Sequence, residues 1–442
     1  MFKIKIRDKL LEELLLFTGK SFSYIFNTPP TSKVNKFIKN LSWSFTGSLI
    51  ITLVMLVVHV VGGRFIGPEE YGKYSLLVSI ATFLVLPIIL GFPTAIQFYV
   101  AKNAKKKKQI ISSAYAIIFV QGIFWISFYF LLKERIIDFL KLDAHLMTAS
   151  LLFVVVFGMY QTTSATLQGL LEINRTTLFQ GVSYSLLLLT FVYLLFFKKN
   201  LSYSSVYLPV ILAYLLFSLL VIISIRKYFF VFSYGWIKIL FQFSFYVILS
   251  RVFFVVITNL DKLMIQYFLS LKFVGIYQAY ITSSQSINLF LGPFLAVYFP
   301  TVSKVKNKVL ILEKINRIAI PVFVFAFVFL FLTALVLLNL YGQQYIVLLD
   351  LVFLFSLAGG IYVVNGLYSF LISSQGIKGV KLISACLFFS MIINFAGNII
   401  FIPRWGLYGA IVATILSYAF LLVFNIFIGK KILKTEGLLK SH

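Results

Sequence analysis

Stretches of about 20 apolar residues recur along the whole of this 442-residue chain, and they limit its fold more than any other feature. A helix that rises 1.5 Å per residue needs about 20 such residues to cross the roughly 30 Å hydrocarbon core of a bilayer. The chain is 61% hydrophobic and 12% charged, which is more apolar surface than one water-soluble core could bury. Runs such as 186–197 and 318–340 are apolar all round, whereas membrane strands alternate polar and apolar residues. The sequence therefore predicts an all-α, multi-pass membrane protein.

About twelve helical spans are expected, in two sets of six. The first set is predicted at residues 42–63, 74–99, 110–132, 147–170, 177–197 and 204–225. The second set is predicted at residues 241–268, 274–300, 316–340, 345–374, 379–402 and 407–429. We therefore divide the chain into a basic amino-terminal segment, two six-helix bundles and a tail, at residues 1–40, 41–226, 227–430 and 431–442.

The basic residues indicate how the spans are oriented. Of the 39 Lys and Arg, 28 fall in the amino-terminal segment, the carboxyl tail and the connections on that side, whereas 9 fall in the opposite connections. Cytoplasmic connections hold the excess of Lys and Arg, so both termini are expected in the cytoplasm. The net charge of +26 lies mostly in short tracts such as Lys105–Lys108, which suit anionic lipid head groups rather than nucleic acid.

The two halves of the chain resemble each other. Gly72–Tyr74 matches Gly275–Tyr277 at an offset of 203 residues. Because six spans separate equivalent points, the halves have the same orientation and are expected to be related by a pseudo-two-fold axis along the membrane normal. Such parallel repeats usually enclose a central substrate path. Four residues are expected to bend helices around it, as hinges or as fixed kinks: Pro87, Pro93, Gly292 and Pro293.

Basic residues inside the spans are candidates for binding an anionic substrate. Arg251 lies within span seven, with apolar residues on both sides and no neighbouring acid. A charge at membrane depth is costly, and Arg binds phosphate through its planar fork. Lys262 lies roughly 16 Å further outward on nearly the same helix face, and the repeat offset places His59 of span one opposite it. As alternatives, Lys262 could snorkel, His59 could be a packed neutral ring, and Arg251 could pair with carbonyls.

Two further charged residues are considered. Asp261 is the carboxylate placed most firmly inside a span, which makes it a candidate for proton or sodium coupling, unless it pairs with a basic residue near the outer face. Arg64 closes span one just before Gly67, where it could gate the outer mouth of the path or snorkel to lipid phosphates. Polar residues such as Gln161 and Asn365 could line the path or join helices by hydrogen bonds.

Four segments carry a family resemblance: Asn40–Trp43, Arg64–Ser75, Asp261–Met264 and Asn394–Thr414. Together they resemble the oligosaccharide flippases of the polysaccharide transporter family, in the superfamily of multidrug and toxic compound extruders and lipid II flippases. The resemblance implies a transporter of the bacterial cytoplasmic (inner) membrane with no enzymatic activity. Its cargo would be an oligosaccharide linked to undecaprenyl diphosphate, moved to the outer leaflet by alternating access for O-antigen or exopolysaccharide synthesis. Membrane lipids and a polymerase of the same pathway are the further candidate partners.

Two other functions stay open. A cation-coupled multidrug extruder would have the same scaffold but should expose acids along its path. A membrane enzyme or scaffold of envelope assembly would need a set of catalytic carboxylates. The sequence has 3 His and 1 Cys, without a nucleotide-binding glycine loop or a credible triad. We therefore expect no catalytic residue, no metal centre and no cofactor other than a coupling H⁺ or Na⁺.

Overall fold

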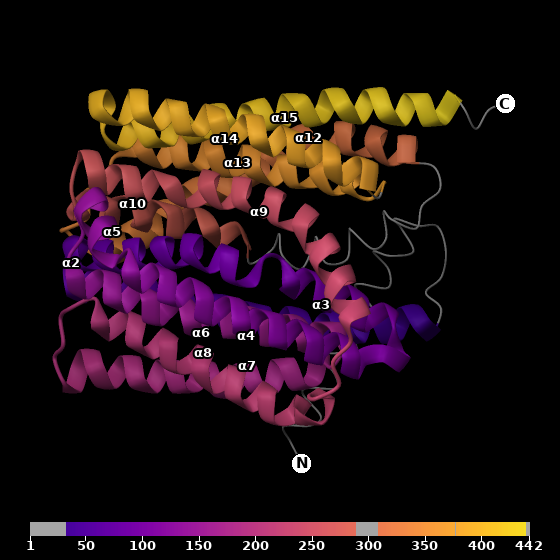
Figure 1. Cartoon of the computed structure of the whole chain (residues 1–442). Coiled ribbons are helices and arrows are strands. Elements are labelled where there is room, and N and C mark those ends of the chain that lie inside the picture. The colour runs from indigo at the N-terminus through magenta and orange to yellow at the C-terminus, as the bar shows by residue number, and fades with distance from the viewer. Residues whose placement is uncertain (1–31, 289–307, 376, 439–442) are drawn as a thin grey trace, which may run out of the picture.

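The computed structural model describes residues 32–288, 308–375 and 377–438, and in these ranges the chain forms helices and no β-strand. The amino-terminal half contains α2 (Ser32–Ile89), α3 (Phe92–Lys102), α4 (Lys107–Leu131), α5 (Lys133–Leu140), α6 (Ala144–Gly169), α7 (Ile173–Val192) and α8 (Ser204–Ile225). The carboxyl-terminal half contains α9 (Tyr234–Phe268), α10 (Leu271–Ser284), α12 (Lys308–Tyr341), α13 (Leu349–Ser373), α14 (Ile377–Trp405) and α15 (Leu407–Leu438). Figure 1 shows these halves as two layers of nearly parallel helices, with α9 running obliquely from the first half to the second.

Ten helices of the described residues are long and apolar enough to cross a membrane, and the first of them contains two crossings. Gly67 interrupts α2 with a φ of 81° and a ψ of 167°. Nδ1 of His59 lies 2.8 Å from Oη of Tyr71, 12 residues later, although a straight helix would separate them by roughly 18 Å. The chain therefore turns back at Gly67. With α10, which begins the span predicted at 274–300, the expected arrangement of about twelve spans in two bundles is confirmed.

Two local features differ from the predicted spans. The span predicted at 74–99 is divided, because Leu90 and Gly91 between α2 and α3 have φ values of 40° and 80°. Pro93 stands in the first turn of α3, where a missing N–H costs no hydrogen bond, and Pro87 lies in the last turn of α2. The helix break lies between these prolines. The other predicted bending residues, Gly292 and Pro293, lie outside the described residues.

The short helix α5 is the second difference, since no element was predicted between spans three and four. Its sequence, KERIIDFL, alternates charged and apolar residues with helical spacing. None of its residues is buried. Asp143, just after α5, lies close enough to Lys73 to interact electrostatically with it, so α5 is at the end of the molecule where the chain turns back at Gly67. An amphipathic helix of this kind suits the surface of a bilayer. The end of the molecule at Gly67, which the basic residues predict to face outward, is called the outer end below.

The two halves meet at the outer end through a symmetric contact of α2 with α10. A β carbon added to Gly72 would lie 2.0 Å from the carbonyl oxygen of Leu271, and one added to Gly275 would lie 1.8 Å from that of Pro68. Each of these pairs is reciprocal under the repeat offset, as is the hydrogen bond from Oγ of Ser75 to Oε1 of Gln278, 203 residues later. Self-complementary contacts of this kind are what a two-fold axis produces. Only glycine allows the backbones to approach so closely.

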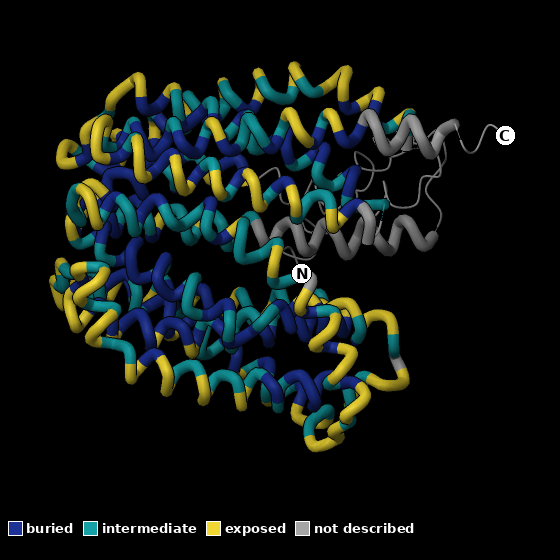
Figure 2. The backbone as a smooth tube through the Cα atoms, turned by 45° about the horizontal axis from the view of Figure 1, so that its top comes forward, coloured by how far each residue is buried: buried dark blue, intermediate teal, exposed yellow. Residues whose placement is uncertain are grey.

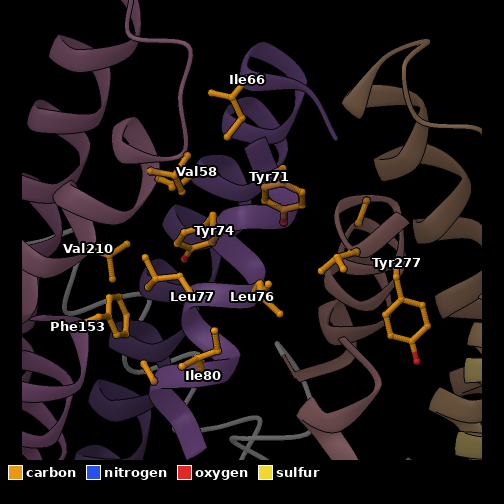
Figure 3. Close-up of a cluster of buried hydrophobic side chains, with 14 of the residues drawn as sticks. Val58, Ile66, Tyr71, Tyr74, Leu76, Leu77, Ile80, Phe153, Val210 and Tyr277 are labelled. Atoms are coloured by element: carbon orange, nitrogen blue, oxygen red, sulfur yellow. The ribbon is translucent and has the colours of Figure 1, made fainter. Parts of the chain in front are cut away.

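The exterior of both bundles is apolar, as lipid contact requires. Figure 2 shows exposed residues along the outer faces of both halves, with the buried ones between the helices. Large apolar side chains are prominent among the exposed residues: Phe119, Leu131, Leu189, Ile320, Val423 and Phe427. The core of the amino-terminal half includes Leu77, Ile80, Phe153 and Val210, drawn in Figure 3. A solvent of hydrocarbon explains why so much apolar surface is not covered by protein.

Candidate functional site

Asp261 of α9 is held by polar side chains of the carboxyl-terminal half alone. It is 3% exposed. Oη of Tyr277 donates to its Oδ2 at 2.7 Å, Oγ1 of Thr414 donates to the same oxygen at 3.0 Å, and Nδ2 of Asn398 donates to Oδ1 at 2.7 Å. Nδ2 of Asn398 also donates to Oδ1 of Asn394 at 3.1 Å. These five residues, from α9, α10, α14 and α15, are called the acid cluster.

The acid cluster has the composition of a site for a small cation. The described residues form two salt bridges, Lys73–Glu70 and Arg175–Glu172. Neither involves Asp261, so its carboxylate has no ion-paired Lys or Arg among these residues. Oδ1 of Asn398 is buried without a hydrogen-bond partner in the described part of the molecule. Carboxylate, amide and hydroxyl oxygens are the ligands of hard cations. No group of three His, Cys, Asp or Glu that could hold a metal ion occurs in the ranges described, so the oxygens of Asn and Thr would have to complete such a site.

A second polar group, called the seam cluster, joins the two halves. Its centre is the hydroxyl of Tyr71, which lies 2.8 Å from Nδ1 of His59, 3.1 Å from Oη of Tyr341 and 3.3 Å from Oγ1 of Thr282. Nε2 of Gln278 donates to the Thr282 hydroxyl at 3.1 Å. His59 and Tyr71 belong to α2, whereas the other three residues belong to α10 and α12. Figure 3 shows Tyr71 on α2, while Tyr277 on α10 points away from α2 into the carboxyl-terminal half.

Lys262 lies beside the seam cluster and is poorly partnered. It is 6% exposed, and its Nζ donates one hydrogen bond, to Oδ1 of Asn259 at 3.4 Å. Oγ of Ser79, from the other half, donates to the same oxygen at 3.4 Å. His59 lies close enough to Lys262 to interact electrostatically with it. A buried ammonium with three N–H groups and one long hydrogen bond is a costly arrangement that an anion would relieve.

Arg251 also bridges the halves. It is partly buried on α9, and its guanidinium donates a hydrogen bond to Oε1 of Gln161 on α6. Nε2 of Gln161 is buried and has no acceptor within the ranges described. None of the salt bridges of the described residues involves Arg251. The sequence-derived candidates Arg251, Lys262 and His59 thus all lie where α9 or α2 faces the other half.

Arg64 is separate from this group. It is exposed at the outer end, with Nη1 3.4 Å from the carbonyl oxygen of Leu340. It lines a half-open cavity of about 550 Å³ together with Asn339 of α12 and with residues that connect α12 to α13, among them Gln343 and Tyr345. Tyr345 ties this connection to the first half by donating to the carbonyl oxygen of Gly63 at 2.9 Å. Arg64 therefore belongs to the outer rim rather than to the junction that contains Lys262.

Sequence reasoning missed the partners of Asp261. It used Asn394 and Thr414 only as part of the family resemblance, and it used Tyr277 only in that resemblance and in the internal repeat. A signal was present, because Asn394 and Asn398 are four residues apart in an otherwise apolar span and so share one helix face. Two amides on one face at membrane depth need polar partners. The sequence could not show that Asp261 is the polar partner of these amides, since Asp261 is 137 residues from Asn398.

Two parallel bundles that cross a membrane, with ionisable side chains at their junction, define a membrane transporter. Residues 37–306 match the model of the family described as "Polysaccharide biosynthesis protein". This match covers more than half of the chain, which therefore belongs to the polysaccharide biosynthesis protein family, as the sequence motifs indicated.

Solved structures of MATE transporters have a similar fold. An inward-facing multidrug resistance MATE family transporter of the MOP superfamily matches with a TM-score of 0.67 and 12% identity, over 87% of this chain and 94% of that chain. An outward-facing structure of such a transporter matches with a TM-score of 0.60 and 11% identity, over 90% and 96%. At this identity the similarity establishes the fold. A search of curated proteins found no match.

Proposed function

We propose that this chain is a flippase that carries an oligosaccharide linked to undecaprenyl diphosphate across the bacterial cytoplasmic membrane, from the cytoplasmic to the outer leaflet. The observation that carries the proposal is the pair of basic residues on α9. Arg251 and Lys262 both face the amino-terminal half, and each is bonded to an uncharged amide rather than to an acid. Two under-compensated cations at a junction between bundles, roughly 16 Å apart along α9, suit an anionic head group that meets one and then the other on its way across.

The neighbouring residues support a cargo that is both charged and polar. Gln161 places an amide group beside Arg251 and Asn259 places one beside Lys262, and amides bind sugar hydroxyls as well as phosphates. The lipid tail would stay in the bilayer while the head group passes between the halves. The basic connections support cytoplasmic termini, so Arg251 would lie nearer the loading side and Lys262 nearer the release side. Membership of the polysaccharide biosynthesis protein family supports the same cargo class.

The acid cluster is proposed to couple transport to a cation gradient, with Na⁺ or H⁺ bound at Asp261. The support is the buried carboxylate without an ion pair and the unpartnered oxygen of Asn398 beside it. Because every hydrogen-bond donor to Asp261 comes from the carboxyl-terminal half, a cation there would draw α10, α14 and α15 together around α9.

A cation-coupled multidrug extruder is the second candidate, favoured by the fold and by the buried Asp261. An extruder of cationic drugs needs acids where the drug passes. Asp261 is instead enclosed by its own half, while the residues at the junction are basic or neutral. We therefore expect deletion of the gene to reduce surface polysaccharide without sensitising the cells to cationic drugs.

Arg251→Gln is expected to reduce surface polysaccharide at least tenfold in a strain that depends on this protein. The substitution removes the charge-assisted hydrogen bonds to phosphate, each worth about 1.5–3 kcal/mol. The measurement is polysaccharide per cell at matched protein levels. Arg226→Gln is the control, since Arg226 is exposed in the connection before α9. Normal polysaccharide in the Arg251→Gln strain would exclude a phosphate-binding role for Arg251.

A further inference from the structure

Polar side chains of α3 and α6 form a line that leads to Arg251. Nε2 of Gln97 on α3 donates to Oε1 of Gln168 on α6 at 3.1 Å, and Nε2 of Gln168 donates to Oγ of Ser164 at 3.2 Å. Gln161 lies two turns before Gln168 on nearly the same face of α6, about 10 Å away. It accepts the hydrogen bond from the guanidinium of Arg251. Gln97 and Gln168 are called the glutamine pair below.

The glutamine pair lies at the inner end of the molecule, opposite the outer end. α3 continues the second crossing of α2 away from Gly67, and α6 runs inward from α5 to Gly169. Phe98, next to Gln97, stacks on Phe243 of α9, with ring centroids 5.4 Å apart and an interplanar angle of 12°. The helices α3 and α9 also pack against each other (Figure 1). Both ends of the line therefore border α9, the first helix of the other half.

The glutamine pair is held in place but remains open to a ligand. A β carbon added to Gly169 would lie 3.1 Å from Cα of Gln97, so the backbones that carry the two amides touch. Both side chains are nevertheless exposed. Their two hydrogen bonds use less than half of the donors and acceptors that two amides offer. At the other end of the line, Nε2 of Gln161 is buried and has no acceptor among the described residues.

We propose that the glutamine pair is the subsite for the first sugars of the cargo, and that it selects among glycans when the cargo loads from the cytoplasm. An amide offers a donor and an acceptor, and so does a sugar hydroxyl, whereas an ionised phosphate offers only acceptors. Phosphate would therefore bind at Arg251, and the sugars would lie along the line on its cytoplasmic side. This division of the cargo rests on the proposed function.

Closure of the inner end would make the subsite selective. In alternating access the loaded head group is shut off from the cytoplasm, so the amides of the glutamine pair leave water. A buried amide without a partner is costly. A glycan with hydroxyls that match the pair would favour closure, whereas a mismatched glycan would leave the amides unpaired and oppose it. The same penalty would oppose closure around a diphosphate lipid that carries no sugar.

Binding of two kinds of probe to the full chain in lipid nanodiscs tests the proposal. One is farnesyl diphosphate, and the other is a set of its glycosides, each with one hexose or N-acetylhexosamine. At least one glycoside is expected to bind the wild-type protein on the order of tenfold tighter than farnesyl diphosphate, from one or two added hydrogen bonds. The Gln97→Leu, Gln168→Leu protein should lose this gain but bind farnesyl diphosphate normally. A merely structural role would change the binding of both probes alike.

Gln343→Leu is the matched control, because Gln343 is exposed at the outer end, and it should keep the full gain. Ser164→Ala is a milder variant that removes only the hydroxyl holding Gln168, and it should reduce the gain.

The proposal is overturned if no glycoside binds the wild-type protein tighter than farnesyl diphosphate does. It is also overturned if the gain persists in the Gln97→Leu, Gln168→Leu protein or, where that protein does not fold, is undiminished by Ser164→Ala. In each of these cases, binding of farnesyl diphosphate by the wild-type protein leaves the proposed flippase function standing. If the folded wild-type protein binds no probe, both the sugar subsite and the proposed diphosphate cargo are wrong.

Discussion

Asp261→Asn is expected to make transport insensitive to an imposed Na⁺ or H⁺ gradient and to lower gradient-driven transport at least tenfold. The carboxylate is the charged member of the acid cluster, and its three donors come from helices α10, α14 and α15. Asparagine has nearly the same shape and keeps an acceptor for these donors, but it cannot hold a proton or balance the charge of a cation. The effect should therefore fall on coupling rather than on folding.

Asp350→Asn is the control for this substitution, because Asp350 is exposed in the first turn of α13. The measurement is transport by purified protein in liposomes, with a gradient of Na⁺ or of H⁺ imposed in turn. The Asp350→Asn protein should respond to the gradient like the wild-type protein. An undiminished response of the Asp261→Asn protein would exclude Asp261 as the coupling residue.

Gly275→Val is expected to hold the two halves apart at the outer end and to lower transport by up to roughly a hundredfold. A β carbon at Gly275 would lie 1.8 Å from the carbonyl oxygen of Pro68, which belongs to the backbone of the other half and has little room to move. Overpacking of this kind costs about 1–3 kcal/mol. Because the contact holds the outer end closed in this structure, the cost acts on this conformation and is expected to shift the population to one that is open outward.

Accessibility to a thiol reagent measures this shift. The chain has the single cysteine Cys386, so Cys386→Ser with Thr282→Cys gives one reactive site in the seam cluster. Thr282 is 6% exposed when the outer end is closed. A membrane-impermeant maleimide added outside should label this position faster with Gly275→Val. Gly181→Ala is the control, since no atom lies within 4 Å of a β carbon there. Equal labelling of the Cys386→Ser, Thr282→Cys protein with and without Gly275→Val or Gly181→Ala would contradict the assignment of the Gly72–Gly275 contact as the outer closure.

Apolar length was enough to predict most of the fold. Spans such as 204–225 and 407–429 agree with α8 and α15 because a bilayer requires about 20 apolar residues wherever a helix crosses it. The break at Leu90 and Gly91 was not predicted in place, because a left-handed leucine has no signature in sequence. The helix α5 was missed because eight residues of mixed charge and apolar character resemble a loop.

Part of the candidate site could be predicted from the sequence because the chain contains an internal repeat. The repeat offset of 203 residues placed His59 opposite Lys262, and the structure brings these two residues close together. Symmetry makes such a pair predictable, because residues related by a two-fold axis meet where they lie near it. The partners of Asp261 do not obey the repeat. They come together through the packing of α9 against α14 and α15, which no local pattern encodes.

The most direct test of the proposed function uses purified protein in liposomes that contain a fluorescent undecaprenyl diphosphate oligosaccharide in both leaflets. A membrane-impermeant reagent that destroys the fluorophore reports how fast inner-leaflet molecules reach the outer leaflet. The account predicts that the wild-type protein exposes nearly all of the fluorophore to the reagent, whereas the Arg251→Gln protein leaves the inner-leaflet fraction protected. Protection that is equal with wild-type protein and with protein-free liposomes would contradict the account.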